Sequence, residues 1–484
     1  MTPTPGQPNF QTGLFINNEF VDALDGSTFD VFNPYDNTLL AKVSEAKHAD
    51  VDRAVAAARK AFPAWAAMSP SDRGVLIGKL AEAIEKDRDN LSLIESLDTG
   101  HPIRDTRNLD VLRTTATFRY FAGMPDKNEG TVIPVETGFL NYVTRVPVGV
   151  VGQVVPWNFP LMFTSWKMGP ALAAGNCVVM KQAELTPLST LRVAELAREV
   201  GFPAGVINVI PGYGHIAGQY LAEHMGVDKL SFTGSTMTGR KIVQASAGNL
   251  KRIQLELGGK GAGLVLHDAD IAKAVGAIQS VWAFHSGQIC TAPTRAIVHR
   301  SRYDELVAAL ANVAPNLKVG DPTAMDTLVG PVISAAQRGR IEGYIQAGAD
   351  EGAEIIVDGR RPAHMERGFY VAPTLIAGCT STMTPVQEEI FGPVVVVVPF
   401  DDEEEAIAIA NGTEFGLYDY VFSQDSDRAY KIARQLRSGN VGINSAQRNH
   451  EAPFGGFKMS GVGRDGGDFG MLCYTEMQSI IWPG

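Results

Sequence analysis

The chain reads VGVVGQVVPWNFP at residues 148–160, a short apolar run that ends in a proline-bounded loop, and a helical pattern follows over Phe163–Ala174. More apolar runs of strand length come after it, with a second helical pattern over Pro187–Val200. These runs are Cys177–Lys181, Val206–Ile210, Lys229–Thr233 and Arg252–Leu255. Short apolar strands that alternate with helices are typical of βαβ units and a parallel sheet. This half of the chain is therefore predicted to be a doubly wound α/β domain of the dinucleotide-binding type.

A second series of apolar runs begins after Gly261 and predicts a second α/β domain, with the boundary near Gly258-Gly259. Its strands are expected at Gly263–Leu266, Arg295–Val298, Val394–Phe400, Asp419–Phe422 and Asn440–Asn444. The length of 484 residues also exceeds what one hydrophobic core usually serves. Residues 130–146 alternate polar and apolar side chains and are interpreted as a projecting hairpin.

Helices are predicted in the N-terminal part of the chain. Apolar residues recur at helical spacing over 49–67, which predicts an amphipathic helix packed on a core, with Trp65 as a structural residue. Ser71 and Asn90 are interpreted as the N-caps of two further helices, over 71–87 and from 90 towards 97.

The composition is that of an ordinary α/β enzyme. Hydrophobic residues make up 45% and charged residues 20%, and the 50 glycines suit many strand-to-helix turns. A net charge of −11 without a long Lys/Arg block argues against nucleic acid as a partner. The first residues contain prolines where a signal peptide needs an apolar core, and no apolar run approaches membrane-spanning length. The four cysteines are far apart, so neither a metal site nor a disulfide framework is expected. The lack of a disulfide framework favours a cytoplasmic location.

Cys290 and Glu256 are the strongest candidates for chemistry. Cys290 lies in GQICTAPTR (287–295), where small neighbours can leave the sulfur open to a ligand, and Glu256 lies in LELGGK (255–260), where desolvation can raise its proton affinity. Either residue alone is more often structural. As a pair they are interpreted as a nucleophile and its base. A Cys/His hydrolase that uses His285 is an alternative, because such partners meet in space.

Several segments that follow strands suit a dinucleotide or an oxyanion. FTGSTMTG (232–239) follows a strand and opens a helix whose N–H groups can hold a pyrophosphate. Lys181 and Glu184 lie at the same sheet edge, where the carboxylate can accept ribose hydroxyls and repel a 2′-phosphate. The amide of Asn158 can stabilise a developing oxyanion. Each segment also has a plain interpretation, as a helix N-cap, a surface ion pair and a self-satisfied turn respectively.

Taken together, these segments resemble those of NAD(P)-dependent aldehyde dehydrogenases. The resemblance runs from about Leu14 to Trp482, and its motifs occur in the family's order. They are PWNFP (156–160), Lys181 with Glu184, FTGST (232–236), LELGGK (255–260), GQICTA (287–292), GPVIS (330–334), EIFGP (389–393) and PFGGFKMSG (453–461). Gln182 departs from the family, which commonly has proline there.

The resemblance implies two Rossmann-like doubly wound domains and a small β oligomerisation element. The NAD-binding domain would comprise residues 1–127 and 148–258, the catalytic domain 259–458, and the oligomerisation element 128–147 and 474–484. Cys290 would attack the aldehyde, while Asn158 and the Cys290 backbone N–H hold the oxyanion. Glu256 would then activate the water that hydrolyses the thioester. The expected reaction gives the carboxylic acid with NAD, NADP remaining possible.

Further residues are assigned by the same resemblance. The cofactor contacts would be Pro156, Trp157, Lys181, Glu184, Gly214, Gly218, Phe232, Gly234, Ser235, Leu257, Glu389 and Phe391. The aldehyde contacts would be Phe159, Phe163, Trp166, Ile289, Thr291 and Phe454. Glu476 resembles a second family glutamate that is linked to proton relay. A homodimer or homotetramer is expected.

The substrate and the last step stay open at this point. The aromatic walls favour a medium-sized hydrophobic or aromatic aldehyde. The loop QRNHE (447–451) is polar, so a substrate with a polar far end is equally compatible. A CoA-acylating semialdehyde dehydrogenase of the same fold is the nearest alternative, although Glu256 favours hydrolysis. A catalytically silent NAD-binding protein is the other alternative.

Overall fold

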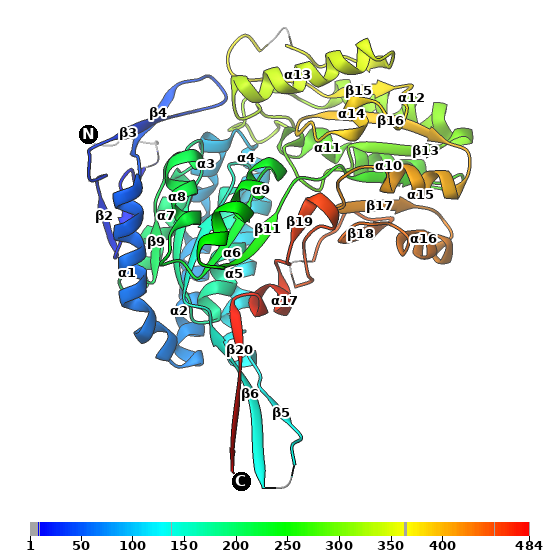
Figure 1. Cartoon of the computed structure of the whole chain (residues 1–484). Coiled ribbons are helices and arrows are strands. Elements are labelled where there is room, and N and C mark those ends of the chain that lie inside the picture. The colour runs from blue at the N-terminus through cyan, green and yellow to red at the C-terminus, as the bar shows by residue number, and fades with distance from the viewer. Residues whose placement is uncertain (1–7, 9, 137, 363–364, 450, 484) are drawn as a thin grey trace.

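Two lobes lie side by side in the computed structural model, and a narrow stalk projects from the first of them (Figure 1). The structure describes residues 8, 10–136, 138–362, 365–449 and 451–483. Each lobe is built around its own β-sheet. Two small elements, β3 (Thr28–Phe32) and β4 (Leu39–Ser44), form a separate antiparallel pair.

The first sheet has eight strands in the order β19-β11-β10-β7-β8-β9-β1-β2. They are β1 (Leu14–Ile16), β2 (Glu19–Val21), β7 (Val150–Val154), β8 (Cys177–Lys181), β9 (Ile207–Val209), β10 (Lys229–Thr233), β11 (Arg252–Glu256) and β19 (Gly461–Val462). Strands β11, β10, β7, β8 and β9 are parallel, which confirms the predicted parallel α/β lobe. Every residue of β7, β8 and β10 is buried, as expected for strands covered on both faces.

The connections of this sheet reverse direction between β7 and β10. The chain runs from β7 through α6 (Pro160–Ala173) to β8, and through α7 (Leu188–Glu199) to β9. It then crosses back to β10, on the other side of β7. Right-handed crossovers in opposite directions place their helices on opposite faces, and the point of reversal leaves a crevice at the carboxyl edge of the sheet. A ligand site is expected where β7 and β10 end.

The remaining helices of this lobe pack around that layer. They are α1 (His48–Ala67), α2 (Pro70–Lys86), α3 (Arg88–Thr99), α4 (Ile103–Asp105), α5 (Val111–Ala122), α8 (Gln219–Glu223), α9 (Thr236–Ala245) and α17 (Gly467–Leu472). Helix α1 packs on β8, whereas α2 and α5 pack outside α6.

Two of the predicted helix starts were wrong. Helix α2 begins at Pro70, and the Ser69 hydroxyl caps it by accepting the N–H of Asp72 at 3.1 Å. Proline suits the first helical position because its φ is fixed and it has no N–H to satisfy, so the helix starts before Ser71. Helix α3 begins without a side-chain cap, and Asn90 lies inside it.

The second sheet has seven strands in the order β14-β15-β16-β13-β12-β17-β18. They are β12 (Ala262–Val265), β13 (Arg295–His299), β14 (Glu354–Val357), β15 (Thr374–Ala377), β16 (Val394–Phe400), β17 (Tyr418–Phe422) and β18 (Asn440–Ile443). All neighbours from β15 to β18 are parallel, so the second α/β lobe is also confirmed. Its helices are α10 (Ile271–Ile278), α11 (Ser280–Ala283), α12 (Tyr303–Val313), α13 (Ala335–Asp350), α14 (Thr384–Gln387), α15 (Glu403–Asn411) and α16 (Ser426–Ala433).

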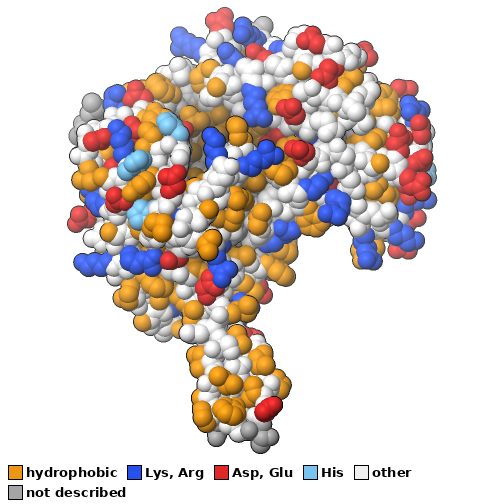
Figure 2. Space-filling view, in the orientation of Figure 1, with side chains coloured by type: hydrophobic (Ala, Val, Ile, Leu, Met, Phe, Trp, Pro, Cys, Tyr) orange, Lys and Arg blue, Asp and Glu red, His pale blue; other side chains and the backbone are white. Residues whose placement is uncertain are grey.

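The stalk is a three-stranded antiparallel sheet of β5 (Thr131–Ile133), β6 (Phe139–Pro147) and β20 (Thr475–Pro483). Strand β20 pairs with β6 along its whole length. Hydrophobic side chains gather on its surface (Figure 2), and Val132 and Met477 are 65% and 69% exposed. The segment after residue 458, which the sequence-based division left unassigned, returns to the first lobe, where β19 pairs with β11.

Candidate active site

A cavity of about 160 Å³ opens at the carboxyl edge of the first sheet, where the lobes meet. Residues of both lobes line it: Pro156, Trp157, Asn158, Phe163, Thr233, Gly234, Ser235, Leu257, Gly258, Cys290, Gln337, Arg340, Glu389 and Phe391. Most of them were predicted from the sequence. The cavity lies where neighbouring strands β7 and β10 end, at the reversal point of the sheet.

Cys290 lies on an irregular loop in an unusual backbone conformation. Three consecutive residues before it have left-handed φ angles, His285 at 48°, Ser286 at 51° and Gly287 at 72°. Such angles in non-glycine residues persist only where the surroundings enforce them. The Gln288 Oε1 atom accepts a backbone N–H from the segment that precedes α13, at 2.9 Å. The loop is thereby fixed, and Cys290, a free thiol, faces the cavity.

The pKa of the Cys290 thiol is raised to about 12. Burial is the main cause, the positive charge of Arg448 opposes it, and the carboxylates of Glu256 and Glu389 add to it. The resting thiol is therefore protonated at neutral pH, and a proton acceptor is needed to make it a nucleophile.

Asn158 is buried and directs its amide at the Cys290 loop. Its Nδ2 atom donates to the backbone oxygen of Gln288 at 2.9 Å. The loop that carries it ends at Pro160, the first residue of α6, which fixes the chain direction there. Since an amide nitrogen has two donors, one N–H stays available for an oxyanion formed at Cys290.

Glu256 ends β11 and is 2% exposed, but it does not line the cavity. Its carboxyl lies close to Gly455, where an added Cβ would be 2.5 Å from Oε1. Neither oxygen has a hydrogen-bond partner among the described residues. Burial and then the charge of Asp465 raise the pKa of Glu256 well above its ordinary value, whereas Lys167 and Arg464 lower it.

The structure does not support Glu476 as a relay partner of Glu256. Glu476 lies on β20 at the root of the stalk and forms an ion pair with Arg252. The ion pair between Lys167 and Asp465 is instead next to Glu256, fully buried, with 2.5 Å between Nζ and Oδ2. No feature of the sequence indicated that Asp465, and not Glu476, would lie next to Glu256.

His285 does not face the nucleophile. Its ring packs 4.5 Å from that of His101 and 5.2 Å from that of Phe159, and it does not line the cavity. Burial lowers its pKa well below the usual histidine value. A Cys/His dyad with Cys290 is therefore not formed.

The cofactor residues predicted on the first sheet follow one edge. The turn after β10 brings Gly234 and Ser235 to the cavity, and Ser235 caps α9 by accepting the N–H of Thr238. A Cβ at Gly234 would be 2.5 Å from the ring of Phe232, so Phe232 supports this turn from beneath. Leu257 completes this wall of the cavity.

Lys181, Glu184 and Gly218 lie further along the edge, outside the cavity lining. The Lys181 Nζ atom is 3.4 Å from Glu184 Oε2, and a Cβ at Gly218 would touch the Lys181 side chain at 3.5 Å. Gly214 begins the same short helical turn as Gly218. Because β8 neighbours β7, this group continues the line that starts at Gly234.

Glu389 and Phe391 reach the cavity from the second lobe. Glu389 Oε1 accepts the N–H of Gly259 at 3.0 Å. The Phe391 ring meets that of Trp157 edge-on at 5.4 Å, and its backbone has a φ of 59°.

Two residues that sequence reasoning missed hold this segment. The Gln337 Nε2 atom donates to the backbone oxygen of Phe391 at 2.8 Å, and the Arg340 Nη2 atom donates to that of Glu389 at 2.7 Å. They lie three residues apart on one face of α13, whose N-cap is Ser334. In the sequence, the Ser334 cap and the spacing of three residues could have indicated that Gln337 and Arg340 share one face of a helix.

The predicted aldehyde contacts divide into two groups. Phe163 lines the cavity beside Cys290, while Trp166 and Phe454 line an adjoining pocket. The remaining three do not line either space and are buried in the core: Phe159, Ile289 and Thr291. Phe159 follows Asn158 in the chain, and Ile289 and Thr291 flank Cys290.

The whole chain was compared with known proteins. The family model described as Aldehyde dehydrogenase family matches residues 20–480. The chain belongs to the aldehyde dehydrogenase family. An aldehyde dehydrogenase of Emericella nidulans is 46% identical over 471 residues, which cover 97% of this chain and 94% of the relative.

Two solved structures with bound NAD have the same fold. PnpE in complex with nicotinamide adenine dinucleotide is 51% identical, with a TM-score of 0.96 and 98% of both chains covered. The NAD+ complex of aldehyde dehydrogenase from Bacillus cereus is 44% identical, with a TM-score of 0.96, and covers 98% of this chain and 96% of that one. The predicted family, the enzyme class and the two Rossmann-like domains are thus confirmed.

In the residues that the structure describes, no helix is long and apolar enough to cross a membrane. Over the same residues, no cluster of three or more His, Cys, Asp or Glu side chains is arranged to hold a metal ion.

Proposed function

We propose that this aldehyde dehydrogenase oxidises an aldehyde to its carboxylic acid with NAD and water, through a thioester on Cys290. The observation that carries this proposal is the cavity in which a thiol, the Asn158 amide and the turn after β10 meet. A nucleophile, an oxyanion donor and a dinucleotide crevice are the groups that the reaction needs.

NAD is the cofactor, as in the NAD-bound relatives. The residues present fit it: the N-terminus of α9 suits a pyrophosphate, and Glu184, whose side chain is 33% exposed, suits ribose hydroxyls and disfavours a 2′-phosphate. Glu389 and Phe391 would contact the nicotinamide end. Bound NAD would supply the acceptor for the hydride that leaves the aldehyde carbon.

In the first step, the Cys290 sulfur forms a bond to the aldehyde carbon and the carbonyl π electrons move to oxygen. The thiol proton passes to Glu256 or to a water. The Asn158 amide and the Cys290 N–H hold the oxyanion until its electrons reform the carbonyl as hydride departs, which leaves a thioester.

Any proton that Glu256 took from Cys290 is first released to solvent water. In the second step, Glu256 takes a proton from a water, and the water oxygen attacks the thioester carbon. The C–S bond then breaks, the sulfur regains a proton and the acid is released. A CoA-acylating enzyme would use a thiol in place of water. The buried carboxylate of Glu256 supports hydrolysis, because its raised pKa makes it a strong base once it is ionised.

We propose further properties of the substrate, the oligomeric state, the domain division and the location. The substrate is a medium-sized aldehyde with a hydrophobic or aromatic body, supported by Phe163, Trp166 and Phe454. The apolar stalk supports a homodimer or homotetramer, because patches of this kind usually mark protein contacts. We also propose the division into an NAD-binding domain, a catalytic domain and an oligomerisation element, and a cytoplasmic location.

The test is NADH absorbance with purified protein, NAD or NADP, and a panel of aldehydes, with and without CoA. We expect NADH and free acid without CoA, and no turnover with Cys290→Ala although NAD still binds. Turnover that requires CoA would overturn the role of Glu256. NAD binding without turnover of any aldehyde would favour a catalytically silent protein.

A further inference from the structure

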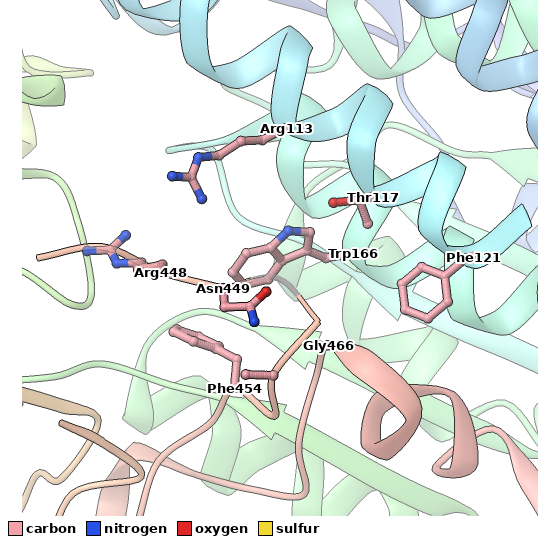
Figure 3. A pocket seen from close by; sticks show the side chains of 9 residues that line it. Arg113, Thr117, Phe121, Trp166, Arg448, Asn449, Phe454 and Gly466 are labelled. Carbon is pink, nitrogen blue, oxygen red and sulfur yellow. The ribbon is translucent and has the colours of Figure 1, made fainter. Parts of the chain in front are cut away.

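Two arginines meet in the pocket that adjoins the catalytic cavity. Helix α5 lines one side with Arg113, Thr117 and Phe121, which share a face because they are four residues apart. The loop after β18 lines the other side with Arg448 and Asn449. Figure 3 shows both guanidinium groups reaching towards the same part of the pocket.

No carboxylate among the described residues forms an ion pair with either arginine. Within the described part of the chain, the lining of the pocket contains no acidic residue, and neither Arg113 nor Arg448 forms an ion pair. Asp110, which directly precedes α5, acts on Arg113 through its charge, but it does not line the pocket, and its Oδ2 lies 2.8 Å from the Nδ1 of His101. Glu451 is exposed and does not line the pocket. The positive charge of the pocket is therefore available to a ligand.

The guanidinium of Arg448 is held in place but not fully satisfied. It lies over the ring of Tyr418, with 5.7 Å to the centroid, and its Nε is buried without a hydrogen-bond partner among the described residues. The Tyr418 hydroxyl donates to the backbone oxygen of Gln447 at 3.2 Å, which fixes the loop beside it. Burial, followed by the charge of Arg448, lowers the pKa of Arg113, and the charge of Asp110 partly opposes this shift. The two cations thus face each other, an arrangement that an anion between them would relieve.

A row of aromatic rings joins this pocket to the nucleophile. The Phe454 and Trp166 centroids are 5.1 Å apart, and those of Trp166 and Phe163 are 5.9 Å apart. Phe163 lines the cavity together with Cys290. An aldehyde that lies along this row with its carbonyl at Cys290 would present its far end to the arginines.

We propose that Arg113 and Arg448 form an anion-binding subsite, and that the preferred substrates are aldehydes with a carboxylate at the end remote from the carbonyl. This inference rests on the proposed oxidation of aldehydes at Cys290. A carboxylate matches the planar donors of two guanidinium groups. The middle of such a substrate would contact the aromatic row, so a semialdehyde of a dicarboxylic acid satisfies both parts of the channel.

The test uses linear ω-oxo acids of increasing length and the methyl ester of each. The ester has nearly the same shape and lacks the charge. We compare kcat/KM of acid and ester, from NADH absorbance with saturating NAD, for the wild-type chain, Arg113→Met and Arg448→Met. The matched control is Arg434→Met, which removes the same charge from an exposed position at the end of α16.

We expect the wild type to favour the acid over the ester at one or more lengths. Each pocket variant should reduce that preference by roughly 10- to 100-fold, mainly through KM, because it removes a hydrogen bond to a charged group. Arg434→Met should keep the wild-type preference. Preference for the ester at every length would overturn the subsite while leaving aldehyde oxidation intact, whereas no NADH from any acid or ester would instead contradict the proposed function.

An equal loss for acid and ester in Arg448→Met would show that Arg448 acts on the Cys290 thiolate, and it would overturn its part in the subsite. Binding measured without turnover gives an independent readout. In Cys290→Ala with NAD present, calorimetry should detect linear dicarboxylates but not their dimethyl esters, and Arg113→Met should weaken that binding. Equal binding of the two kinds of ligand would refute the proposal even where a variant folds poorly.

Discussion

Replacing Glu256 with glutamine would separate the two chemical steps assigned to the site. The amide has nearly the size of the carboxyl group but cannot take a proton from water. One round of aldehyde attack and oxidation should still occur, since water can accept the Cys290 proton. The thioester should then accumulate, and the steady-state rate should fall by roughly 10²- to 10⁴-fold, the usual contribution of a general base.

The same substitution should change stability with a sign that follows from burial. Because the pKa of Glu256 is raised well above 4.5, the folded chain binds this proton more tightly than the unfolded chain. The wild type therefore loses up to about 1.4 kcal/mol of unfolding free energy per pH unit, from the unfolded value of 4.5 up to the folded pKa. Glu256→Gln removes this titration, so its stability relative to wild type should rise with pH above about 4.5, and the difference should be constant below that pH.

Rapid mixing with NAD and an aldehyde tests the first expectation, because NADH should appear as a burst of about one per active site. Mass spectrometry should find the acyl group on Cys290, and denaturation at several pH values tests the second expectation. The control is Glu476→Gln, which alters a half-buried carboxylate paired with Arg252 and should give no burst. A Glu256→Gln enzyme that turns over at the wild-type rate would refute the role of Glu256, and a pH-independent stability difference would refute the assignment of its titration.

Other substitutions test the remaining parts of the site. Asn158→Ala should lower kcat by roughly 10²- to 10³-fold, the usual effect of losing one oxyanion donor, with NAD affinity unchanged by calorimetry. Gly258→Ala should raise the KM for NAD, because the new Cβ would be 2.3 Å from Glu389 Oε2 and must displace that carboxylate; an unchanged KM would argue against a cofactor role for Glu389. Alkylation of Cys290 by iodoacetamide in the cofactor-free enzyme should keep accelerating as pH rises towards about 12, and a plateau near neutral pH would contradict the raised pKa. Ile481→Asp, on the apolar stalk, should yield monomers in analytical ultracentrifugation if the stalk joins subunits, and an unaltered sedimentation coefficient would place the interface elsewhere.

Much of the fold could be predicted from the sequence because its central strands are buried on both faces. The predicted runs Cys177–Lys181 and Lys229–Thr233 coincide with β8 and β10 at both ends. A strand covered on both faces is apolar throughout, so its limits are visible where polar or glycine residues begin. The positions of Cys290 and Asn158 followed for the same reason, since both lie on loops whose anchoring strands or motifs were recognised.

The contacts that sequence could not supply join segments distant along the chain. Gln337 holds Phe391 by a hydrogen bond between residues 54 positions apart. Arg113 lies on α5, a helix in which no sequence motif was recognised. It becomes a candidate binding residue only because the fold places it in the same pocket as Arg448. Glu476 was misjudged because its place depends on the pairing of β20 with β6, which carries it to the stalk. Side-chain partners across elements are set by packing and not by spacing.

The electrostatics of the site bear on the order of the proposed steps. The charge of Glu256 raises the pKa of Cys290, so an ionised Glu256 disfavours the thiolate. Only one of them needs to be ionised at a time, the thiolate for attack and the carboxylate for hydrolysis. Once Cys290 carries an acyl group it can no longer form a thiolate, so an ionised Glu256 no longer opposes a step at the sulfur when the base is required. Acylation would then itself prepare the site for water, whereas a permanently ionised Glu256 would oppose the first step by disfavouring the thiolate.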